Sequence, residues 1–258
     1  MPLLSVIVPC YNESRTIRSI IAQVQSIHLD KEIIIVDDHS RDDSPAILAE
    51  LQQTDAAIRV FRHEVNRGKG GAIRTGLAQA TGDIVIIQDA DLEYDPTDYY
   101  ELVYPIVSGK VDVVFGARFF GRHTGMYFWN AIGNKGLTFI TNFFYNSWLS
   151  DMETCYKVMR TDIMRSLKLE SRDFRIEPEM AAKILRLGYR VYEVPISYMG
   201  RTYEEGKKIR PSDGLKAIST LLRFVRWRGA TPQLKPIDSQ VAEQAITSIR
   251  QHTFRPLS

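Results

Sequence analysis

The sequence is poor in the residues and runs that mark several large classes of protein. Its only cysteines, Cys10 and Cys155, lie far apart and form no C-x-x-C pair, so neither a zinc site nor a disulfide framework is expected. The five histidines show no spacing typical of metal ligands. No apolar run approaches the roughly 20 residues of a membrane span, and the N-terminal residues lack the basic segment of a signal peptide. These absences favour a reducing, cytoplasmic compartment.

Two common nucleotide-binding motifs are also missing. The glycine-rich stretch Asn66–Ala72 lacks the G-K-[ST] ending of a P-loop. A dinucleotide fingerprint should follow the first strand, but Pro9–Glu13 contains no glycine. The net charge of +2 and the dispersed basic residues give no support to nucleic-acid binding.

The first half of the chain alternates between two hydrophobic patterns. Short, nearly continuous apolar runs predict buried strands, and apolar residues at helical spacing predict helices between them. Strands are expected at Leu4–Pro9, Glu32–Asp37, Ile58–Arg62 and Val111–Gly116, and a further one in the apolar run that begins at Ile84 and ends in two aspartates, within residues 84–91. Strands that alternate with helices favour an α/β fold with a mostly parallel sheet and right-handed crossovers. With 258 residues, the chain has room for a large domain of this class.

After Gly116 the pattern changes. A loop rich in glycine, arginine and aromatic residues is expected at Arg118–Tyr127, followed by an aromatic helix at Asn134–Trp148. An amphipathic helix with several basic residues is expected at Leu215–Arg228. Beyond Gly229 the chain turns polar, which predicts a poorly ordered tail. The expected division is therefore a domain at residues 1–229 and a tail at 230–258.

The most informative feature is a buried strand that ends in two carboxylates, Asp89 and Asp91. The carboxyl edge of a parallel sheet is where open α/β folds bind their ligands. The two carboxylates share one face of an extended chain, and no lysine is near them in sequence, so they repel one another unless a cation intervenes. Mg²⁺ or Mn²⁺ holding a diphosphate suits such oxygen ligands. Two aspartates at this spacing are, however, often ordinary exposed residues that contact only water.

Three other polar segments follow predicted strands at the same edge, namely Pro9–Glu13, Val36–Asp38 and Asn66–Ala72. Each has an ordinary structural interpretation as a helix cap, a turn or a tight glycine turn. Their convergence on the carboxyl ends of consecutive parallel strands instead predicts a nucleotide site.

Together these motifs resemble an inverting family 2 glycosyltransferase of the GT-A fold, in the dolichyl-phosphate mannose synthase-like branch. The resemblance covers roughly residues 3–228 and rests on Ser5–Glu13, Val36–Asp38, Asn66–Ala72, Asp89–Asp91, Gly116–Arg118, Gly188–Arg190, Glu193–Ile196, Gly200–Thr202 and Gly206–Lys208. It implies a Rossmann-like, mostly parallel sheet flanked by helices, with a C-terminal amphipathic helix.

The resemblance also implies roles for individual residues. The nucleotide-sugar site would comprise Pro9, Tyr11, Glu13, Asp38, Lys69, Asp89, Ala90, Asp91, Arg201 and Lys207. Asp89 and Asp91 would hold the metal, with Glu93 as a further ligand, and Arg118 would meet an acceptor phosphate. The basic residues that family members place near Trp129 and Asn130 for that phosphate are absent. Substitutes could come from Arg122, His123 or Lys135.

The implied reaction moves a sugar from GDP-mannose or a UDP-hexose to a polyprenyl or dolichyl phosphate. Such a phosphate is largely ionised at pH 7 and needs no general base. The enzymatic alternative is a hydroxyl acceptor on a saccharide or cell-envelope glycan, which requires a carboxylate base, with Asp151 and Glu153 as candidates. A non-catalytic nucleotide-sugar-binding subunit is an alternative of another class, although the intact Asp89 and Asp91 pair argues against it.

The aromatic and basic helices have two interpretations. Stripes at helical spacing usually pack into the core. They could instead form an interfacial surface, with aromatic rings at lipid headgroups and basic side chains on anionic lipids. The second interpretation predicts peripheral contact with the cytoplasmic face of a membrane.

Overall fold

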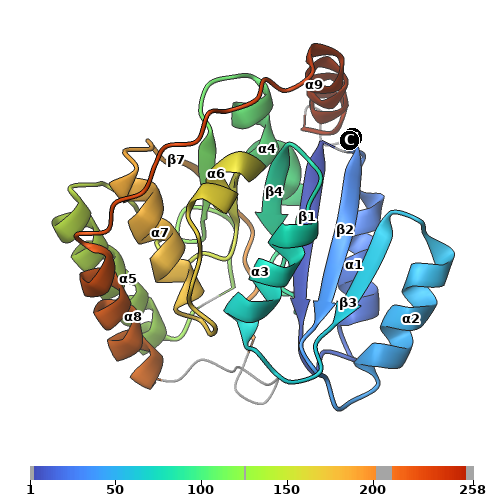
Figure 1. The fold of residues 1–258 in the computed structure, drawn as a ribbon, viewed down its shortest axis with the longest axis horizontal. Coiled ribbons are helices and arrows are strands. Elements are labelled where there is room, and N and C mark those ends of the chain that lie inside the picture. Colours follow the sequence, from blue (N-terminus) through green and yellow to red (C-terminus); the bar gives the residue numbers. More distant parts are fainter. Residues whose placement is uncertain (1–2, 125, 202–210, 254–258) are drawn as a thin grey trace.

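The computed structural model describes residues 3–124, 126–201 and 211–253. A seven-stranded sheet runs through the molecule in the order β3-β2-β1-β4-β6-β5-β7 (Figure 1). The strands are β1 (Leu4–Cys10), β2 (Lys31–Asp37), β3 (Ile58–Arg62), β4 (Ile84–Ile87), β5 (Val113–Ala117), β6 (Lys157–Arg160) and β7 (Tyr192–Pro195). The apolar runs of β1, β2 and β4 are buried along almost their whole length, as expected for strands covered on both faces.

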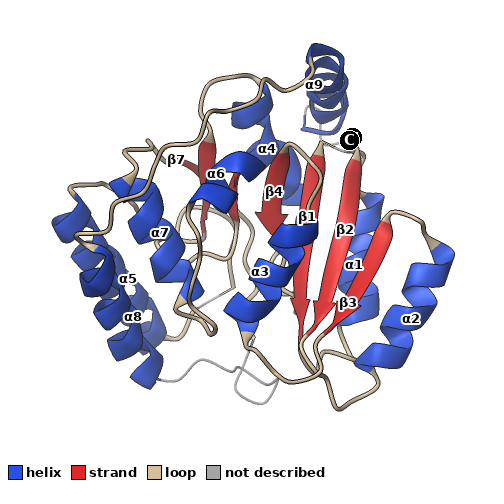
Figure 2. Cartoon of the chain, viewed as in Figure 1, coloured by secondary structure: helices blue, strands red, loops and turns tan. Residues whose placement is uncertain are grey.

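Helices cover both faces of this sheet. They are α1 (Ile17–Ser26), α2 (Ser44–Thr54), α3 (Lys69–Gln79), α4 (Tyr99–Val107), α5 (Phe128–Tyr145), α6 (Thr161–Ser166), α7 (Ile176–Arg186), α8 (Pro211–Phe224) and α9 (Ser239–Thr253), with a short 3₁₀ turn at Pro96–Asp98. Figure 2 shows α3, α6 and α7 in front of the sheet and α1 and α4 behind it. The predicted α/β fold with a mostly parallel sheet is therefore confirmed.

One strand departs from the parallel arrangement. β6 runs antiparallel to both of its neighbours, β4 and β5, whereas β1 pairs in parallel with β2 and β4, and β5 pairs in parallel with β7. The long excursion through α5 brings the chain back in the opposite direction between two strands that are already placed. Local hydrophobic patterns carry no information on that direction.

The strand order reverses between β1 and β4. From β1 the chain proceeds to β2 and β3 on one side, and it then crosses back to place β4 on the other side. Ligands of open α/β sheets bind where the strand order reverses in this way. β1 and β4 end close together, because the Gln88 N–H donates to the Ile7 carbonyl at 2.9 Å. The loops that follow the two strands therefore start side by side.

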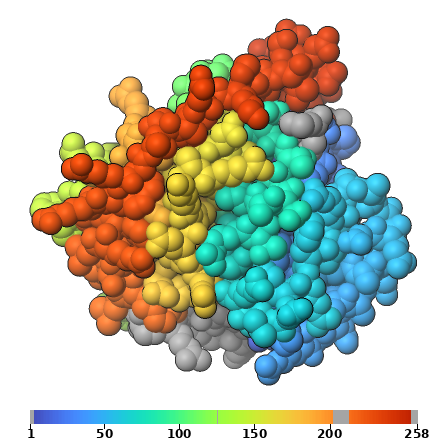
Figure 3. Space-filling view, viewed as in Figure 1, coloured from blue at the N-terminus to red at the C-terminus, as the bar shows by residue number. Residues whose placement is uncertain are grey.

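The C-terminal part of the chain corrects the prediction of a poorly ordered tail. Residues 239–253 form α9, which packs against α4 and buries Ala245 and Ile249. The His252 ring stacks on His28 and on Tyr100, with centroid distances of 4.7 and 4.9 Å. Figure 3 shows the chain before α9 running across the surface to reach it. The apolar stripe of α9 is short and lies among polar residues, so the polar composition of this segment gave no indication of a packed helix.

Candidate active site

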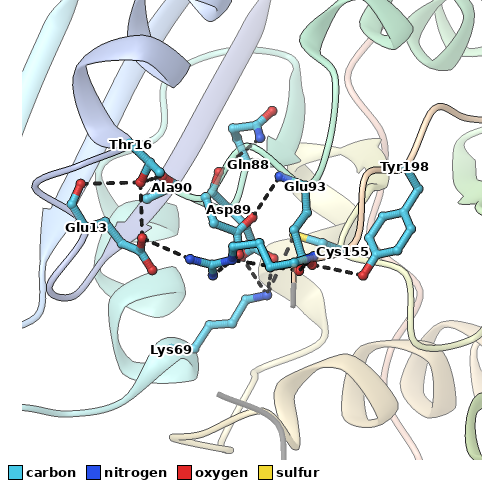
Figure 4. Close-up of polar contacts among 11 residues, drawn as sticks. Glu13, Thr16, Lys69, Gln88, Asp89, Ala90, Glu93, Cys155 and Tyr198 are labelled. Carbon is cyan, nitrogen blue, oxygen red and sulfur yellow. Dashed lines mark hydrogen bonds and ion pairs between the residues drawn. The ribbon is translucent and has the colours of Figure 1, made fainter. Parts of the chain in front are cut away.

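Acidic and basic side chains from four separate segments meet at the carboxyl edge of β1 and β4. Glu13 follows β1, Lys69 begins α3, Asp89 and Asp91 follow β4, and Arg201 lies beyond β7. In Figure 4, Glu13 and Glu93 approach from opposite sides and Lys69 reaches toward Asp89 between them. The predicted convergence of these strand ends is thus observed.

The first of the two aspartates is paired with a lysine. Lys69 Nζ lies 2.7 Å from Asp89 Oδ1 and 3.2 Å from Glu177 Oε1. Burial would raise the pKa of Asp89, but the charge and hydrogen bond of Lys69 hold that pKa below its ordinary value. The lysine that is missing from the neighbouring sequence is thus supplied by folding, which brings Lys69 to Asp89 from twenty positions upstream.

The second aspartate is paired with Arg201. Arg201 Nη2 lies 2.5 Å from Asp91 Oδ2, and Nη1 lies 3.3 Å from Glu13 Oε2. Burial, followed by repulsion from Asp89 and Glu93, raises the pKa of Asp91 to about 7, although Arg201 opposes this rise. Lys69 and Arg201 thus face five carboxylates, so the cluster retains an excess of negative charge; these are Asp89, Glu177, Asp91, Glu13 and Glu93.

Glu93 anchors the segment that carries Arg201. Its Oε2 accepts a hydrogen bond from the Tyr198 hydroxyl at 2.9 Å, and its Oε1 accepts one from the Arg201 backbone N–H at 2.8 Å. Its backbone carbonyl accepts the Met199 N–H at 2.8 Å. These three bonds fix the chain after β7 against the loop after β4, so both Glu93 oxygens already have partners.

A buried polar network holds the backbone of Asp89. The Gln88 side-chain oxygen accepts hydrogen bonds from the hydroxyls of Tyr99 and Tyr156, each at 2.7 Å. The Gln88 amide then donates to the Asp89 carbonyl at 3.0 Å. Because all of these groups are buried and paired, the Asp89 backbone is held rigidly at the end of β4.

The predicted nucleoside-binding residues lie together but differ in what they can contact. Pro9 and Tyr11 are half-buried at the end of β1, while Ala90 is buried and its carbonyl accepts the Thr16 hydroxyl at 2.8 Å. Asp38 is also buried, and its oxygens accept the backbone N–H groups of Arg67 and Gly68, both at 2.7 Å. The Asp38 carboxylate therefore orders the glycine turn.

The glycine turn itself packs against the protein's own backbone. Gly68 has a positive φ of 77°, and a Cβ atom at Gly70 would lie 2.3 Å from the Ser171 carbonyl oxygen. The backbone of residues 171–172 thus approaches these glycines more closely than any side chain would allow. This contact fixes the start of α3 and with it Lys69.

Arg118 and Asp151 are paired with each other. Arg118 Nε lies 2.6 Å from Asp151 Oδ2, and Nη2 lies 2.7 Å from Oδ1. Both residues are buried, and the Arg118 guanidinium lies 5.2 Å from the centre of the Tyr198 ring. The pair therefore supports the wall of the site that carries Tyr198. Both carboxylate oxygens of Asp151 accept hydrogen bonds from Arg118.

The second candidate base, Glu153, has a different environment. Its Oε1 is buried and lacks a hydrogen-bond partner within the described structure. Burial raises the pKa of Glu153 to about 7. A carboxyl group in this state can accept or release a proton near neutral pH.

Some predicted residues lie apart from the cluster, and others were missed. Lys207 lies outside the described residues. Arg122, His123 and Lys135, the proposed substitutes for the acceptor phosphate, are exposed. Glu177 was not predicted from the sequence, although a carboxylate on the apolar face of a helix is an unusual feature that could have revealed it.

The donor set allows a divalent cation. Among the residues that the structure describes, no three His, Cys, Asp or Glu side chains enclose a ready-made metal site. Asp89 and Asp91 nevertheless offer hard oxygen ligands, and the cluster around them keeps an excess of negative charge. The residues therefore fit a cation that takes its remaining ligands from a bound diphosphate.

Known proteins resemble this chain in sequence and in fold. The UDP-N-acetylglucosamine–dolichyl-phosphate N-acetylglucosaminyltransferase of Methanococcus voltae is 28% identical over 239 residues, covering 85% of this chain and 95% of that protein. Glycosyltransferase AglD of Haloferax volcanii is 28% identical over 204 residues, covering 76% of this chain and 33% of that protein. Mycobacterium tuberculosis glucosyl-3-phosphoglycerate synthase, crystallised with Mn²⁺, UDP and glucosyl-3-phosphoglycerate, superposes with a TM-score of 0.65 at 22% identity, covering 87% of this chain and 80% of that one.

The last similarity confirms the expected GT-A fold. The model of the family described as "Glycosyl transferase family 2" matches residues 5–168, which is more than half of the chain. This region contains the glycine turn and both aspartates of the cluster. The chain therefore belongs to glycosyl transferase family 2.

Proposed function

We propose that this glycosyltransferase moves a sugar from a nucleoside-diphosphate sugar to the phosphate of a polyprenyl lipid such as dolichyl phosphate. The observation that carries the proposal is the meeting of Glu13, Lys69, Asp89, Asp91 and Arg201 at the carboxyl edge of β1 and β4. The name of the Methanococcus relative supports both a uridine nucleotide donor and a dolichyl-phosphate acceptor.

Asp89 and Asp91 would hold Mg²⁺ or Mn²⁺. When bound, the cation supplies positive charge to the diphosphate as it leaves the anomeric carbon. Glu93 stays outside this ligand set, because its oxygens hold Tyr198 and the Arg201 backbone.

The basic residues of the cluster would bind the diphosphate. Lys69 enters from the start of α3 and Arg201 from the segment beyond β7, so each aspartate has a cation beside it. Fixed positive groups that face developing negative charge are an effective source of catalysis, because they need no reorganisation during the reaction. The family resemblance also assigns Lys207 to the diphosphate. Tyr11 and Glu13 would contact the nucleoside.

A phosphate acceptor agrees with the state of the candidate bases. Asp151 is committed to Arg118, so it is a poor general base, whereas an ionised phosphate requires none. The state of Glu153 favours the second candidate, a hydroxyl acceptor on a glycan. Its buried Oε1 lacks a hydrogen-bond partner among the described residues and burial raises its pKa to about 7, so it could take a proton from a hydroxyl group.

The surface of α5 supports a lipid-linked acceptor. No helix in the described ranges is long and apolar enough to cross a membrane. The helix does not bury its aromatic rings: Trp129 is 79% exposed and Phe143 is 74% exposed, and Trp148, just beyond the helix, is 93% exposed. The sequence from Phe119 to Ser150 contains no acidic residue, and neither does that from Gly214 to Ile237, which includes most of α8. We propose that this aromatic surface, with the exposed basic residues of α8 beside it, rests on an anionic membrane.

Transfer assays test the donor and the acceptor. Purified protein should move labelled sugar from a UDP-sugar to dolichyl phosphate with Mn²⁺, and EDTA should abolish the transfer. Asp91→Asn should fold normally but lose turnover, while the exposed Arg18→Gln serves as a matched control. Transfer to a free saccharide and none to dolichyl phosphate would favour the hydroxyl acceptor, and binding without transfer or hydrolysis would favour a non-catalytic subunit.

A vesicle assay tests the surface. Wild-type protein should sediment with phosphatidylglycerol vesicles at low salt and be released as salt rises, since each basic residue near an anionic surface contributes about 1 kcal/mol. The combined removal of Lys216, Arg223, Arg226 and Arg228 should release it, whereas neutralising Lys31, Arg41 and Arg59 elsewhere should not. Wild-type protein that ignores anionic vesicles at low salt contradicts the membrane proposal.

A further inference from the structure

Arg201 and a divalent cation compete for the same carboxylate. The Arg201 guanidinium lies 2.5 Å from Asp91 Oδ2 and 3.3 Å from Glu13 Oε2, so it already engages one of the two Asp91 oxygens that a cation would use. Two cations on one carboxylate repel one another, most strongly where both approach the same oxygen, so each weakens the binding of the other. A metal ion can therefore use Asp91 fully only when Arg201 has left it.

Arg201 is also poorly satisfied where it lies. Its Nε is buried, has no hydrogen-bond partner within the described residues, and lies 3.8 Å from Glu93 Oε1. The backbone is held independently of the side chain, since the Arg201 N–H donates to Glu93. The side chain can thus exchange its acidic partners while its backbone remains in place. A guanidinium suits the paired oxygens of a diphosphate, which would satisfy more of its N–H groups.

Lys69 does not have this freedom. It lies between Asp89 and Glu177, and it starts a helix whose first turn is packed against residues 171–172. Of the two cations, Arg201 is therefore the one whose movement can open an aspartate to a metal ion.

We propose that Arg201 couples metal binding to nucleotide binding by occupying Asp91 until a nucleoside diphosphate draws it away. This inference rests on the proposed use of a nucleoside-diphosphate donor. The metal alone must displace Arg201 without offering it a new anion, so it binds weakly. The diphosphate provides that anion, so each ligand strengthens the binding of the other by the same factor.

The test measures Mn²⁺ binding directly, without turnover, from the electron paramagnetic resonance signal of the free ion. In wild-type protein, saturating UDP or GDP should tighten Mn²⁺ binding by a factor in the usual range for coupled sites, about 5–150. Arg201→Gln should bind Mn²⁺ alone about tenfold more tightly than wild type, because a charge-assisted contact no longer competes. In that variant the nucleotide should change Mn²⁺ affinity by less than about threefold.

Two further variants serve as controls. Arg18→Gln removes an exposed arginine from the surface pair with Glu50, so it should behave as wild type. Arg201→Lys keeps the charge but loses the forked geometry, and its coupling should be intermediate. Circular dichroism should show that all variants are folded.

The outcomes separate this inference from the proposed function. If Arg201→Gln binds Mn²⁺ no better than wild type, or keeps the wild-type coupling, the inference is overturned while the donor proposal stands. If neither UDP nor GDP binds in the presence of Mn²⁺, both are overturned.

Discussion

The buried pair of Arg118 and Asp151 gives the sharpest test of how the structure differs from the family expectation. The expectation places Arg118 on an acceptor phosphate, so Arg118→Ala would weaken acceptor binding and leave the fold intact. In the structure, two short hydrogen bonds join Arg118 to Asp151, which is fully buried. Removing the arginine leaves a buried carboxylate without its partner. Such a loss typically costs about 3–5 kcal/mol, a large share of the roughly 5–15 kcal/mol that stabilises a whole protein.

Arg118→Ala should therefore lower the midpoint of urea unfolding, and its melting temperature should fall by about 10 °C at the usual 2–4 °C per kcal/mol for a chain of this size. Asp151→Ala should show a similar loss. The double variant Arg118→Met, Asp151→Leu should recover most of the stability, since neither charge is then left unpaired.

The comparison needs a control that changes an arginine without changing a buried pair. Arg175→Ala is suitable, because its contact with Asp173 is largely exposed, and it should cost less than about 1 kcal/mol. The reasoning fails if Arg118→Ala unfolds at the wild-type urea concentration. If that variant instead raises the KM for the acceptor at unchanged nucleotide affinity, Arg118 contacts the acceptor.

Three further predictions concern the scaffold. Burial raises the pKa of Asp98 to about 7, above its ordinary value of roughly 3.9, so its contribution to stability falls as the pH rises from about 4 to 7. Asp98→Asn should thus be more stable than wild type at pH 8, by about 2 kcal/mol after allowance for partial exposure, and equal to it at pH 4; equal urea midpoints at pH 8 would contradict the burial argument. Gly70→Ala should lower the melting temperature by several degrees because its Cβ would meet the Ser171 carbonyl, whereas Gly136→Ala in the open middle of α5 should raise it slightly; a silent Gly70→Ala would contradict the close packing of the glycine turn. Ile249→Ala should cost about 2–5 kcal/mol in urea unfolding, and no loss would mean that α9 does not contribute to the core.

The local patterns of the sequence determined most of the fold. Continuous apolar runs predicted β1, β2, β3 and β5 within two residues at either end, and the start of β4, because a strand buried on both faces can carry few polar residues. The alternation of these strands with segments of helical spacing then predicted a mostly parallel sheet. The same reasoning placed Asp89 and Asp91 at the carboxyl edge of β4, and the motif order was enough to suggest the family that the comparison confirms. These features depend on residues that are neighbours along the chain.

Only the tertiary structure decided which charges meet. Arg201 pairs with Asp91 across 110 positions and with Glu13 across 188, and Arg118 pairs with Asp151 across 33. The antiparallel direction of β6 and the packing of α9 against α4 are likewise long-range results. A charged residue in a sequence shows what it can bind, but not which partner folding will bring to it. The electrostatic state of the site is a sum over such distant pairs, so it follows only once the chain has been placed in space.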